Sequence, residues 1–297
     1  MDASELRYDD LVDRVEVLYG EQQYGAAVEL LDAESAGLEV WSAELAHLKA
    51  CLLGAAGDAD AALRVLQEAS TAGAWWRPEI LTEDDDLTAL RDRPELRELV
   101  GVSEARATNE PARPLIALPS GEAVGIVVAL HGAGQRAEHA LRDWAGVLEL
   151  GYALVCVQSS YRISPMYRTW PDPEQARADI ARALAELPAH GLPVGGRLPV
   201  VAAGFSAGGR VALDWAFSGE PVPVDGVLAM APALRRLPDR RELGPLSPAT
   251  IWIGADDDLL EVVDAAADQL TGITIERIPG LGHAFPADFA AELAKVL

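Results

Sequence analysis

The hydrophobic pattern of the first hundred residues is helical. Alanine, leucine and glutamate are abundant there, and apolar residues recur every three or four positions, which places them on one face of an α-helix. A weak internal repeat accompanies this pattern, since a shift of 35 residues superimposes three apolar positions: Ala27, Leu30 and Leu31 on Ala62, Val65 and Leu66. Residues 1–100 are therefore predicted to form a small all-α domain, with amphipathic helices around 5–19, 24–37, 41–54 and 58–73.

This period resembles that of tetratricopeptide-type helix–turn–helix pairs, which is about 34 residues. The segment 75–100 resembles the stretch that closes such arrays. The resemblance implies a helical-repeat region whose concave surface takes a peptide or protein partner or makes an interdomain contact. Residues 1–110 hold 25 acidic and 9 basic side chains, against 22 and 15 in residues 111–297, so we expect that partner to be basic.

The pattern changes after residues 101–114, a polar stretch with two prolines that we interpret as a linker. Short, nearly continuous apolar runs then alternate with helical stretches, which is typical of a mostly parallel sheet with helices on both faces. Residues 115–297 are therefore predicted to form an α/β domain, and its first two strands, close together, indicate an antiparallel edge. The predicted strands are 115–118, 124–130, 152–158, 199–204, 225–231, 250–254 and 273–278. The predicted helices are 137–149, 173–187, 207–218, 259–270 and 286–297.

Charge and cysteine content narrow the function classes. The net charge of −23 argues against nucleic acid and anionic membranes as partners, because both select Lys and Arg. The N-terminus lacks an apolar core and no apolar run approaches 18 residues, so we expect no secretory signal, no membrane span and a cytoplasmic location. Cys51 and Cys156 are expected to be buried free thiols. No Cys and His cluster has metal-ligand spacing, so the sequence predicts no metal site.

The candidate chemistry lies in loops that follow the predicted strands, because the carboxyl ends of parallel strands meet at one edge of a sheet. Gly204-Phe205-Ser206-Ala207-Gly208 forms a G-x-S-x-G pattern between a strand and a helix. A serine on such a tight turn projects above the sheet, and the helix N-terminus offers free N–H groups to an oxyanion. The alternative interpretation is a glycine-rich turn with a helix-capping serine.

A second loop, His131-Gly132-Ala133-Gly134, follows strand 124–130. The N–H groups of Ala133 and Ala207 are the predicted oxyanion donors, since both can point at the same carbonyl oxygen. We interpret His131 itself as a buried or orienting histidine and not as a catalytic one.

Two late loops offer a carboxylate and a histidine. After strand 250–254, three aspartates are adjacent: Asp257 is the predicted partner of the histidine, Asp256 is the second candidate, and Asp258 is expected to cap the next helix. A solvated acidic turn is the alternative. His283 lies in a loop after strand 273–278 and is the predicted base, so that the chain order is Ser206, Asp257, His283.

The segments "LHGAG", "GFSAGG", "GADD" and "GLGH" together resemble the α/β-hydrolase superfamily, specifically its phospholipase/carboxylesterase and dienelactone-hydrolase-like group. The resemblance spans nearly all of 115–297 and implies a serine esterase that needs no metal or cofactor, with Ser206 as nucleophile, His283 as base and Asp257 as acid. Two departures stand out. Ala207 replaces the Gln of many thioesterase-like relatives, which leaves the N–H in place, and the loop reads "HGAG", unlike the "HGGG" of hormone-sensitive-lipase relatives.

The predicted substrate is a small-molecule ester. The irregular loop 158–175 follows the carboxyl end of a strand and is expected to wall the pocket, with Tyr161, Tyr167 and Trp170 as substrate contacts. An ordinary packed loop is the alternative. Two rival functions remain open: a serine peptidase of the prolyl-oligopeptidase type, and a non-catalytic adaptor that binds its partner through the helical region.

Overall fold

The structure of the chain, a computed structural model, describes residues 3–192, 198–234 and 245–297. Its contacts divide the chain into two compact units. The first unit comprises Met1–Asn109 and the loop segment Arg162–Tyr167, and the second comprises Glu110–Tyr161 and Arg168–Leu297. Each unit has buried hydrophobic clusters of its own. Within the described ranges, no helix is long and apolar enough to cross a bilayer.

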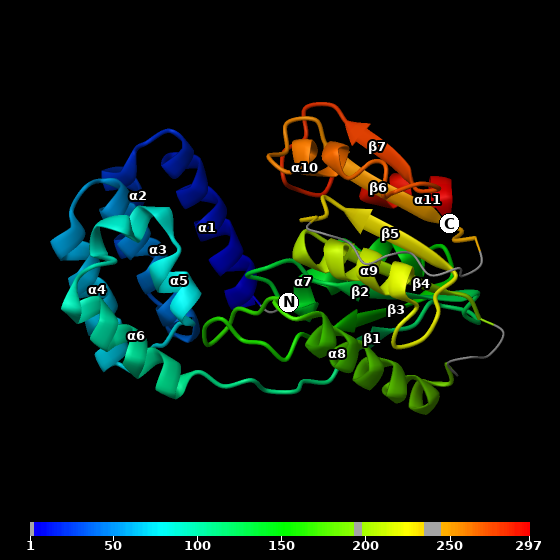
Figure 1. Ribbon diagram of the computed structural model, residues 1–297, viewed down its shortest axis with the longest axis horizontal. Coiled ribbons are helices and arrows are strands. Elements are labelled where there is room, and N and C mark those ends of the chain that lie inside the picture. Colours follow the sequence, from blue (N-terminus) through cyan, green and yellow to red (C-terminus); the bar gives the residue numbers. More distant parts are fainter. Residues whose placement is uncertain (1–2, 193–197, 235–244) are drawn as a thin grey trace. The chain divides into compact units, whose positions relative to one another are not determined.

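The first unit is built from helices, as the sequence predicts (Figure 1). Several begin at residues that favour a helix start: the Asp58 side chain accepts the Ala61 N–H at 2.9 Å, and Pro78 and Pro94 occupy the first turns of their helices. The elements are α1 (Ala3–Gly20), α2 (Tyr24–Glu34), η1 (Glu39–Trp41, 3₁₀), α3 (Ser42–Ala55), α4 (Ala59–Thr71), α5 (Pro78–Thr82), η2 (Asp85–Leu90, 3₁₀) and α6 (Pro94–Arg106).

The apolar positions that repeat in the sequence occupy equivalent places in α2 and α4. Ala27 and Leu31 of α2 are buried, and so are Ala62 and Leu66 of α4. A 35-residue shift thus relates two helices that bury the same face. The assignment of this region to tetratricopeptide-type repeats stays a prediction.

Helix α6 ends later than the sequence indicates, because residues 101–106, predicted to open the linker, are helical. Ser103 is fully buried, and the Arg106 guanidinium donates to the carbonyl oxygens of Ser70 and Ala74. These contacts hold the last turn of α6 against the end of α4 despite its polar sequence. The chain leaves the helix only after Arg106.

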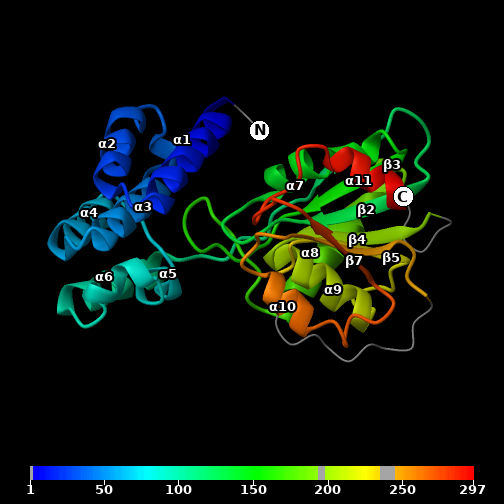
Figure 2. The same ribbon diagram turned by 90° about the horizontal axis from the view of Figure 1, so that it is seen from above.

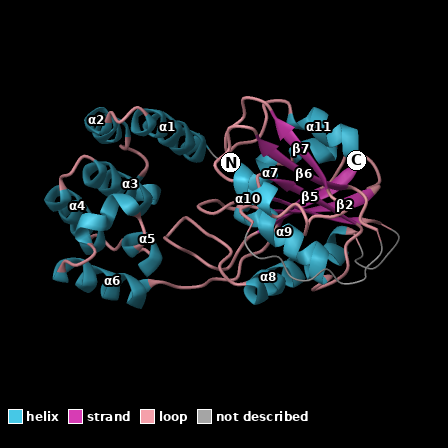
Figure 3. Cartoon of the chain, turned by 45° about the horizontal axis from the view of Figure 1, so that its top comes forward, coloured by secondary structure: helices cyan, strands magenta, loops and turns pink. Residues whose placement is uncertain are grey.

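The second unit contains a seven-stranded sheet (Figure 3), and its strands, labelled in Figure 1, follow the order β1-β3-β2-β4-β5-β6-β7. All neighbouring pairs are parallel except β1 and β3, so the antiparallel edge is present as predicted. However, β1 pairs with β3 and not with β2, whose residues are all buried between two other strands. The strands are β1 (Leu115–Ala117), β2 (Gly125–Leu130), β3 (Tyr152–Val157), β4 (Val200–Phe205), β5 (Gly226–Met230), β6 (Ala249–Gly254) and β7 (Thr274–Ile278).

Helices cover both faces of this sheet, with α8 and α9 on one face and α7 and α11 on the other (Figure 2). The segment predicted as one helix over 137–149 forms α7 and η3, interrupted at Trp144, whose backbone leaves the helical region at φ −96° and ψ 4°. The elements are α7 (Ala137–Asp143), η3 (Ala145–Leu148, 3₁₀), α8 (Pro173–Glu186), η4 (Leu187–His190, 3₁₀), α9 (Ala207–Ser218), α10 (Leu260–Ala265) and α11 (Phe289–Val296).

The strand register brings the candidate loops to one edge of the sheet. Leu130 at the end of β2 is paired with Gly204 of β4, and Gly254 at the end of β6 is paired with Ile278 of β7. The loops after these four strands therefore leave the sheet at the same end.

Candidate active site

Ser206 occupies the sharp turn between β4 and α9. Its backbone has φ 51° and ψ −117°, a conformation that a residue with a Cβ rarely adopts. Backbone hydrogen bonds hold this conformation: the Ser206 N–H donates to Met230 O at 3.0 Å, and the Ser206 carbonyl accepts from Ala233 N at 3.0 Å and Arg210 N at 3.1 Å. The turn is therefore fixed from both sides of the serine.

The two motif glycines are required by close backbone approach. A Cβ on Gly204 would lie 2.3 Å from the carbonyl oxygen of Gly208, and a Cβ on Gly208 would lie 2.3 Å from that of Leu130. Both separations are shorter than real Cβ contacts, and the atoms met are backbone atoms, which cannot rotate away. The glycines let helix α9 pass directly over the ends of β2 and β4.

Replacing Gly208 by alanine is expected to lower the free energy of unfolding by about 3 kcal/mol, because rigid backbone must move to admit the methyl group. Denaturant unfolding followed by circular dichroism measures this change. The matched control is Gly121→Ala in the same unit, since a Cβ at Gly121 meets nothing within 4 Å. Equal stabilities of the two variants would contradict the steric argument.

The structure brings Ser206, His283 and Asp257 into one hydrogen-bonded chain. His283 Nε2 lies 3.0 Å from Ser206 Oγ, and His283 Nδ1 lies 2.9 Å from Asp257 Oδ2. The Asp257 side chain is fully buried, whereas 40% of the His283 side chain is exposed. The carboxylate thus orients the imidazole from below while its other nitrogen reaches the serine hydroxyl.

Burial distinguishes the three adjacent aspartates, among which the sequence alone does not settle the partner of His283. Asp256 and Asp258 are exposed, whereas Asp257 is buried and its Oδ1 accepts the Leu259 N–H at 2.8 Å. The Asp256 N–H donates to Leu281 O at 3.0 Å, which joins the aspartate turn to the His283 loop. The expectation that Asp258 caps the next helix is wrong, because α10 begins after Leu259 and has no side-chain cap.

His131 is a buried structural residue beside this site. The Ser159 N–H donates to His131 Nε2 at 3.3 Å, so Nδ1 carries the proton and donates to Gly132 O at 2.7 Å. Burial lowers the pKa of His131 to about 3. The ring is therefore neutral at physiological pH, and it holds the loop after β2 against the loop after β3.

Acidification is expected to destabilise the fold through His131. The unfolded chain binds a proton with a pKa near 6.5, and the folded chain only near 3, so stability falls as the pH drops between these values. This group alone contributes a slope of at most about 1.4 kcal/mol per pH unit. Free energies of unfolding at several pH values should fall less steeply for His131→Asn than for the wild type, and equal slopes would refute the assignment.

The two predicted oxyanion donors have free N–H groups. Ala207 is the first residue of α9, and Ala133 lies in the loop after β2. Within the described part of the chain, neither N–H donates a hydrogen bond, whereas the neighbouring Gly132 N–H donates to Gln135 Oε1 at 2.8 Å and Gly134 N–H to Arg168 O at 2.9 Å. Gln135 and Arg168 thus brace this loop, a role that the sequence did not reveal.

The loop 158–175 differs from its predicted role. Trp170 is 2% exposed and its Nε1 donates to His131 O at 2.8 Å, so its predicted substrate contact is wrong: the ring is packed beneath the site. Tyr167 lies in the first unit, where its hydroxyl is 2.5 Å from that of Tyr8, so it does not wall the site as predicted. The Tyr167 ring packs against a buried hydrophobic cluster of the helical unit. Tyr161 is half-buried, and its substrate contact stays a prediction.

Phe205 is a neighbour of the site that sequence reasoning missed. Its ring centroid lies 4.9 Å from that of His283 and 5.0 Å from that of Phe285. The residue occupies the variable position before the motif serine, so no pattern in the sequence marks it. Its ring supports one face of the imidazole and limits how that side chain can turn.

The sheet order and the helices on both faces define the second unit as an α/β-hydrolase fold, which is preceded in the chain by an all-helical unit, as predicted. Residues 7–111, nearly all of the helical unit, match the family model described as "A/B hydrolase-like, N-terminal domain".

The chain is similar to many solved structures, which include an uncharacterized protein, a thioesterase and a dienelactone hydrolase. An uncharacterized protein from Bacillus cereus ATCC 10987 shares 23% identity over 97% of both chains, with a TM-score of 0.47. Acyl-protein thioesterase 2 of Zea mays shares 19% identity over 62% of this chain and 96% of its own, with a TM-score of 0.47. A dienelactone hydrolase from Anabaena variabilis ATCC 29413 shares 18% identity over 62% of this chain and 89% of its own, with a TM-score of 0.45. No curated protein matches the chain.

Proposed function

We propose that the chain is a serine hydrolase that cleaves carboxylic esters through Ser206, His283 and Asp257. The observation that carries this proposal is the hydrogen-bonded chain from Ser206 Oγ through His283 to Asp257, at 3.0 Å and 2.9 Å. The strained backbone of Ser206 supports it further, since strain of this kind is retained where it presents a reactive group.

The reaction begins with attack of Ser206 Oγ on the ester carbonyl carbon. His283 Nε2 takes the hydroxyl proton, and Asp257 stabilises the imidazolium through Nδ1–H. The carbonyl oxygen becomes an oxyanion, which we expect the N–H groups of Ala133 and Ala207 to bind. His283 then returns its proton to the departing alcohol, which leaves an acyl group on Ser206.

Water completes the cycle by the same route. His283 Nε2 removes a proton from water as the oxygen attacks the acyl carbonyl, and the proton passes to Ser206 Oγ when the acid leaves. This chemistry asks for no metal or cofactor. Tyr161 is the substrate contact that we retain from the sequence-based prediction.

Two parts of the proposal rest on sequence alone. The acidic helical unit is assigned a basic peptide or protein partner, because residues 1–110 carry a large excess of acidic side chains. A cytoplasmic location is likewise retained from the sequence-based prediction.

A labelling experiment with a substrate panel tests the proposed function. A fluorophosphonate probe should modify Ser206, identified by mass spectrometry of the peptides, and p-nitrophenyl esters should be hydrolysed. Preferential cleavage of peptide anilides would favour the peptidase instead. If Ser206 is not labelled and no substrate is cleaved, the chain is not a serine hydrolase, and the non-catalytic adaptor is the function that remains.

A further inference from the structure

The first unit contains a cavity of about 400 Å³ that the proposed ester hydrolysis does not use. Apolar side chains such as Val12, Val15 and Leu48 form much of its wall, and no Lys or Arg is among the described residues that line it. The lining does contain acidic side chains, among them Glu16 and Asp86. The cavity therefore favours a cation over an anion.

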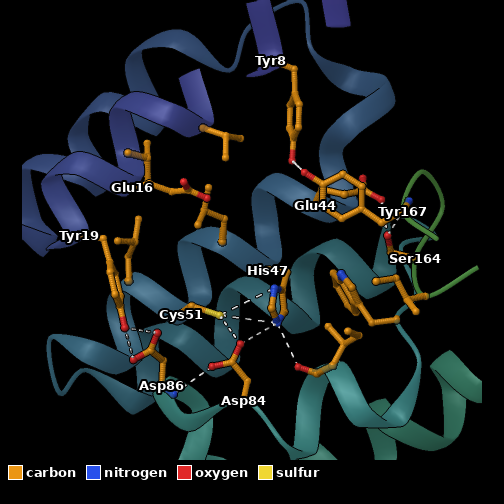
Figure 4. A pocket seen from close by; sticks show the side chains of 17 residues that line it. Tyr8, Glu16, Tyr19, Glu44, His47, Cys51, Asp84, Asp86, Ser164 and Tyr167 are labelled. Atoms are coloured by element: carbon orange, nitrogen blue, oxygen red, sulfur yellow. Dashed lines mark hydrogen bonds and ion pairs between the residues drawn. The ribbon is translucent and has the colours of Figure 1, made fainter. Parts of the chain in front are cut away.

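Three side chains of different donor types meet at the wall of this cavity (Figure 4). Cys51 Sγ lies 3.3 Å from Asp84 Oδ2 and 3.6 Å from His47 Nε2, and His47 Nε2 lies 3.6 Å from Asp84 Oδ2. Among the described residues, this is the one group of three His, Cys, Asp or Glu side chains close enough to share a metal ion.

Secondary structure brings the three donors together. His47 and Cys51 are four residues apart on α3, so both side chains project from the same face of the helix. Asp84 is the N-cap of η2, and its Oδ1 accepts the Asp86 N–H at 3.0 Å, which leaves Oδ2 facing the cysteine and the histidine.

We propose that His47, Cys51 and Asp84 bind a zinc-type divalent transition-metal ion. Zinc bond lengths and tetrahedral angles place sulfur, nitrogen and oxygen ligands roughly 3.4–3.6 Å from one another. The three separations here, 3.3, 3.6 and 3.6 Å, lie within about 0.3 Å of these edges. Cys51 Sγ also lies 3.8 Å from His47 Nδ1, so the imidazole must turn for its Nε2 lone pair to face the ion. A thiolate and an imidazole select zinc-like ions over Mg²⁺ and Ca²⁺, which prefer oxygen ligands only.

The cavity supplies an entry path and a fourth ligand position. The side chains of His47 and Asp84 are 21% and 27% exposed, and all three donors line the cavity. Water occupies the fourth position, as in metal sites with three protein ligands.

Metal binding replaces existing hydrogen bonds. In the metal-free chain the Cys51 thiol donates to Asp84 and His47 Nε2 lies 3.1 Å from the carbonyl oxygen of Ile80. When the ion binds, the thiol proton passes to bulk water, the imidazole carries its remaining proton on Nδ1, and Nε2 uses its lone pair for the metal. The ion then links α3 directly to the segment before η2, which stabilises the helical unit.

Cobalt(II) titration of the full chain, without an affinity tag and after chelator treatment, tests this site. We expect one Co²⁺ per chain, a thiolate-to-cobalt charge-transfer band and intense visible bands of a four-coordinate ion, all displaced by Zn²⁺. Cys51→Ser should abolish the charge-transfer band, and His47→Gln and Asp84→Asn should weaken affinity tenfold or more. The matched controls, Cys156→Ala and His190→Gln, should bind as the wild type does.

A second measurement needs no substitution. Zn²⁺ should slow modification of Cys51 by a thiol reagent in the wild-type chain and raise the thermal unfolding midpoint, while Mg²⁺ should do neither. An unchanged charge-transfer band in Cys51→Ser, or equal thiol reactivity with and without Zn²⁺, would overturn the proposal in favour of a hydrogen-bonded cluster alone. Both readouts are independent of ester hydrolysis.

Discussion

Replacing Ser206 by alanine is expected to lower kcat for a p-nitrophenyl ester on the order of 10⁶-fold, the loss typical when a triad nucleophile is removed. The substitution deletes only the hydroxyl that attacks the carbonyl. It keeps the Cβ, the turn, and the hydrogen bond between His283 and Asp257 at 2.9 Å. Steady-state hydrolysis, with active sites counted by fluorophosphonate labelling, gives the comparison.

The matched control is Ser218→Ala at the other end of α9. Ser218 is buried, and its Oγ lies 3.4 Å from the carbonyl oxygen of Trp215. This variant loses a hydroxyl from the same helix without touching the triad, so its kcat should stay close to that of the wild type. If both variants retain wild-type turnover, Ser206 is not the nucleophile.

Replacing Asp257 by asparagine is expected to lower kcat about 10⁴-fold. An amide at this position is uncharged, and when its NH₂ group faces His283 Nδ1 it favours the tautomer that carries the proton on Nε2. His283 then cannot take the proton of Ser206 Oγ, although the side-chain volume hardly changes. Single-turnover and steady-state ester hydrolysis both report this loss.

Asp256→Asn and Asp258→Asn are the matched controls for this prediction. Both side chains are exposed, whereas Asp257 is buried and contacts His283 directly. They should therefore retain nearly the full kcat of the wild type. A large loss in either control, with Asp257→Asn active, would assign the acid to a different aspartate.

The local sequence pattern was sufficient to predict most of the helices and strands. The helix over 207–218 begins and ends where it was predicted, and the central strands shift by a residue or so, because a buried parallel strand is a continuous apolar run. The order of the strands within the sheet was harder to predict from the sequence. The sequence places β1 beside β2 along the chain, but in the sheet β1 pairs with β3.

The sequence indicates Ser206, Asp257 and His283 as candidate residues because each follows a strand whose carboxyl end lies at one edge of a parallel sheet. That rule needs only the order of elements. The choice among three adjacent aspartates requires knowing which side chain is buried in the folded protein. The burial of Trp170 likewise becomes visible only in the tertiary structure.

The neighbours of Tyr167 and of His47 also could not be predicted from the sequence. An aromatic residue in a loop was expected to face a substrate, but its ring lies beside Tyr8 in the helical unit. The sequence predicted no metal site, because Asp84 lies 33 residues after Cys51 and no short spacing joins them.

The sequence by itself determined the helical first part, the α/β second part and the loops that carry Ser206, Asp257 and His283, because periodicity and strand-end position are local properties of the chain. Only the tertiary structure decided the strand order, the buried aspartate, the position of Tyr167 and the meeting of His47, Cys51 and Asp84. These features depend on which distant segments share a core, and that is set by packing and burial over the whole unit.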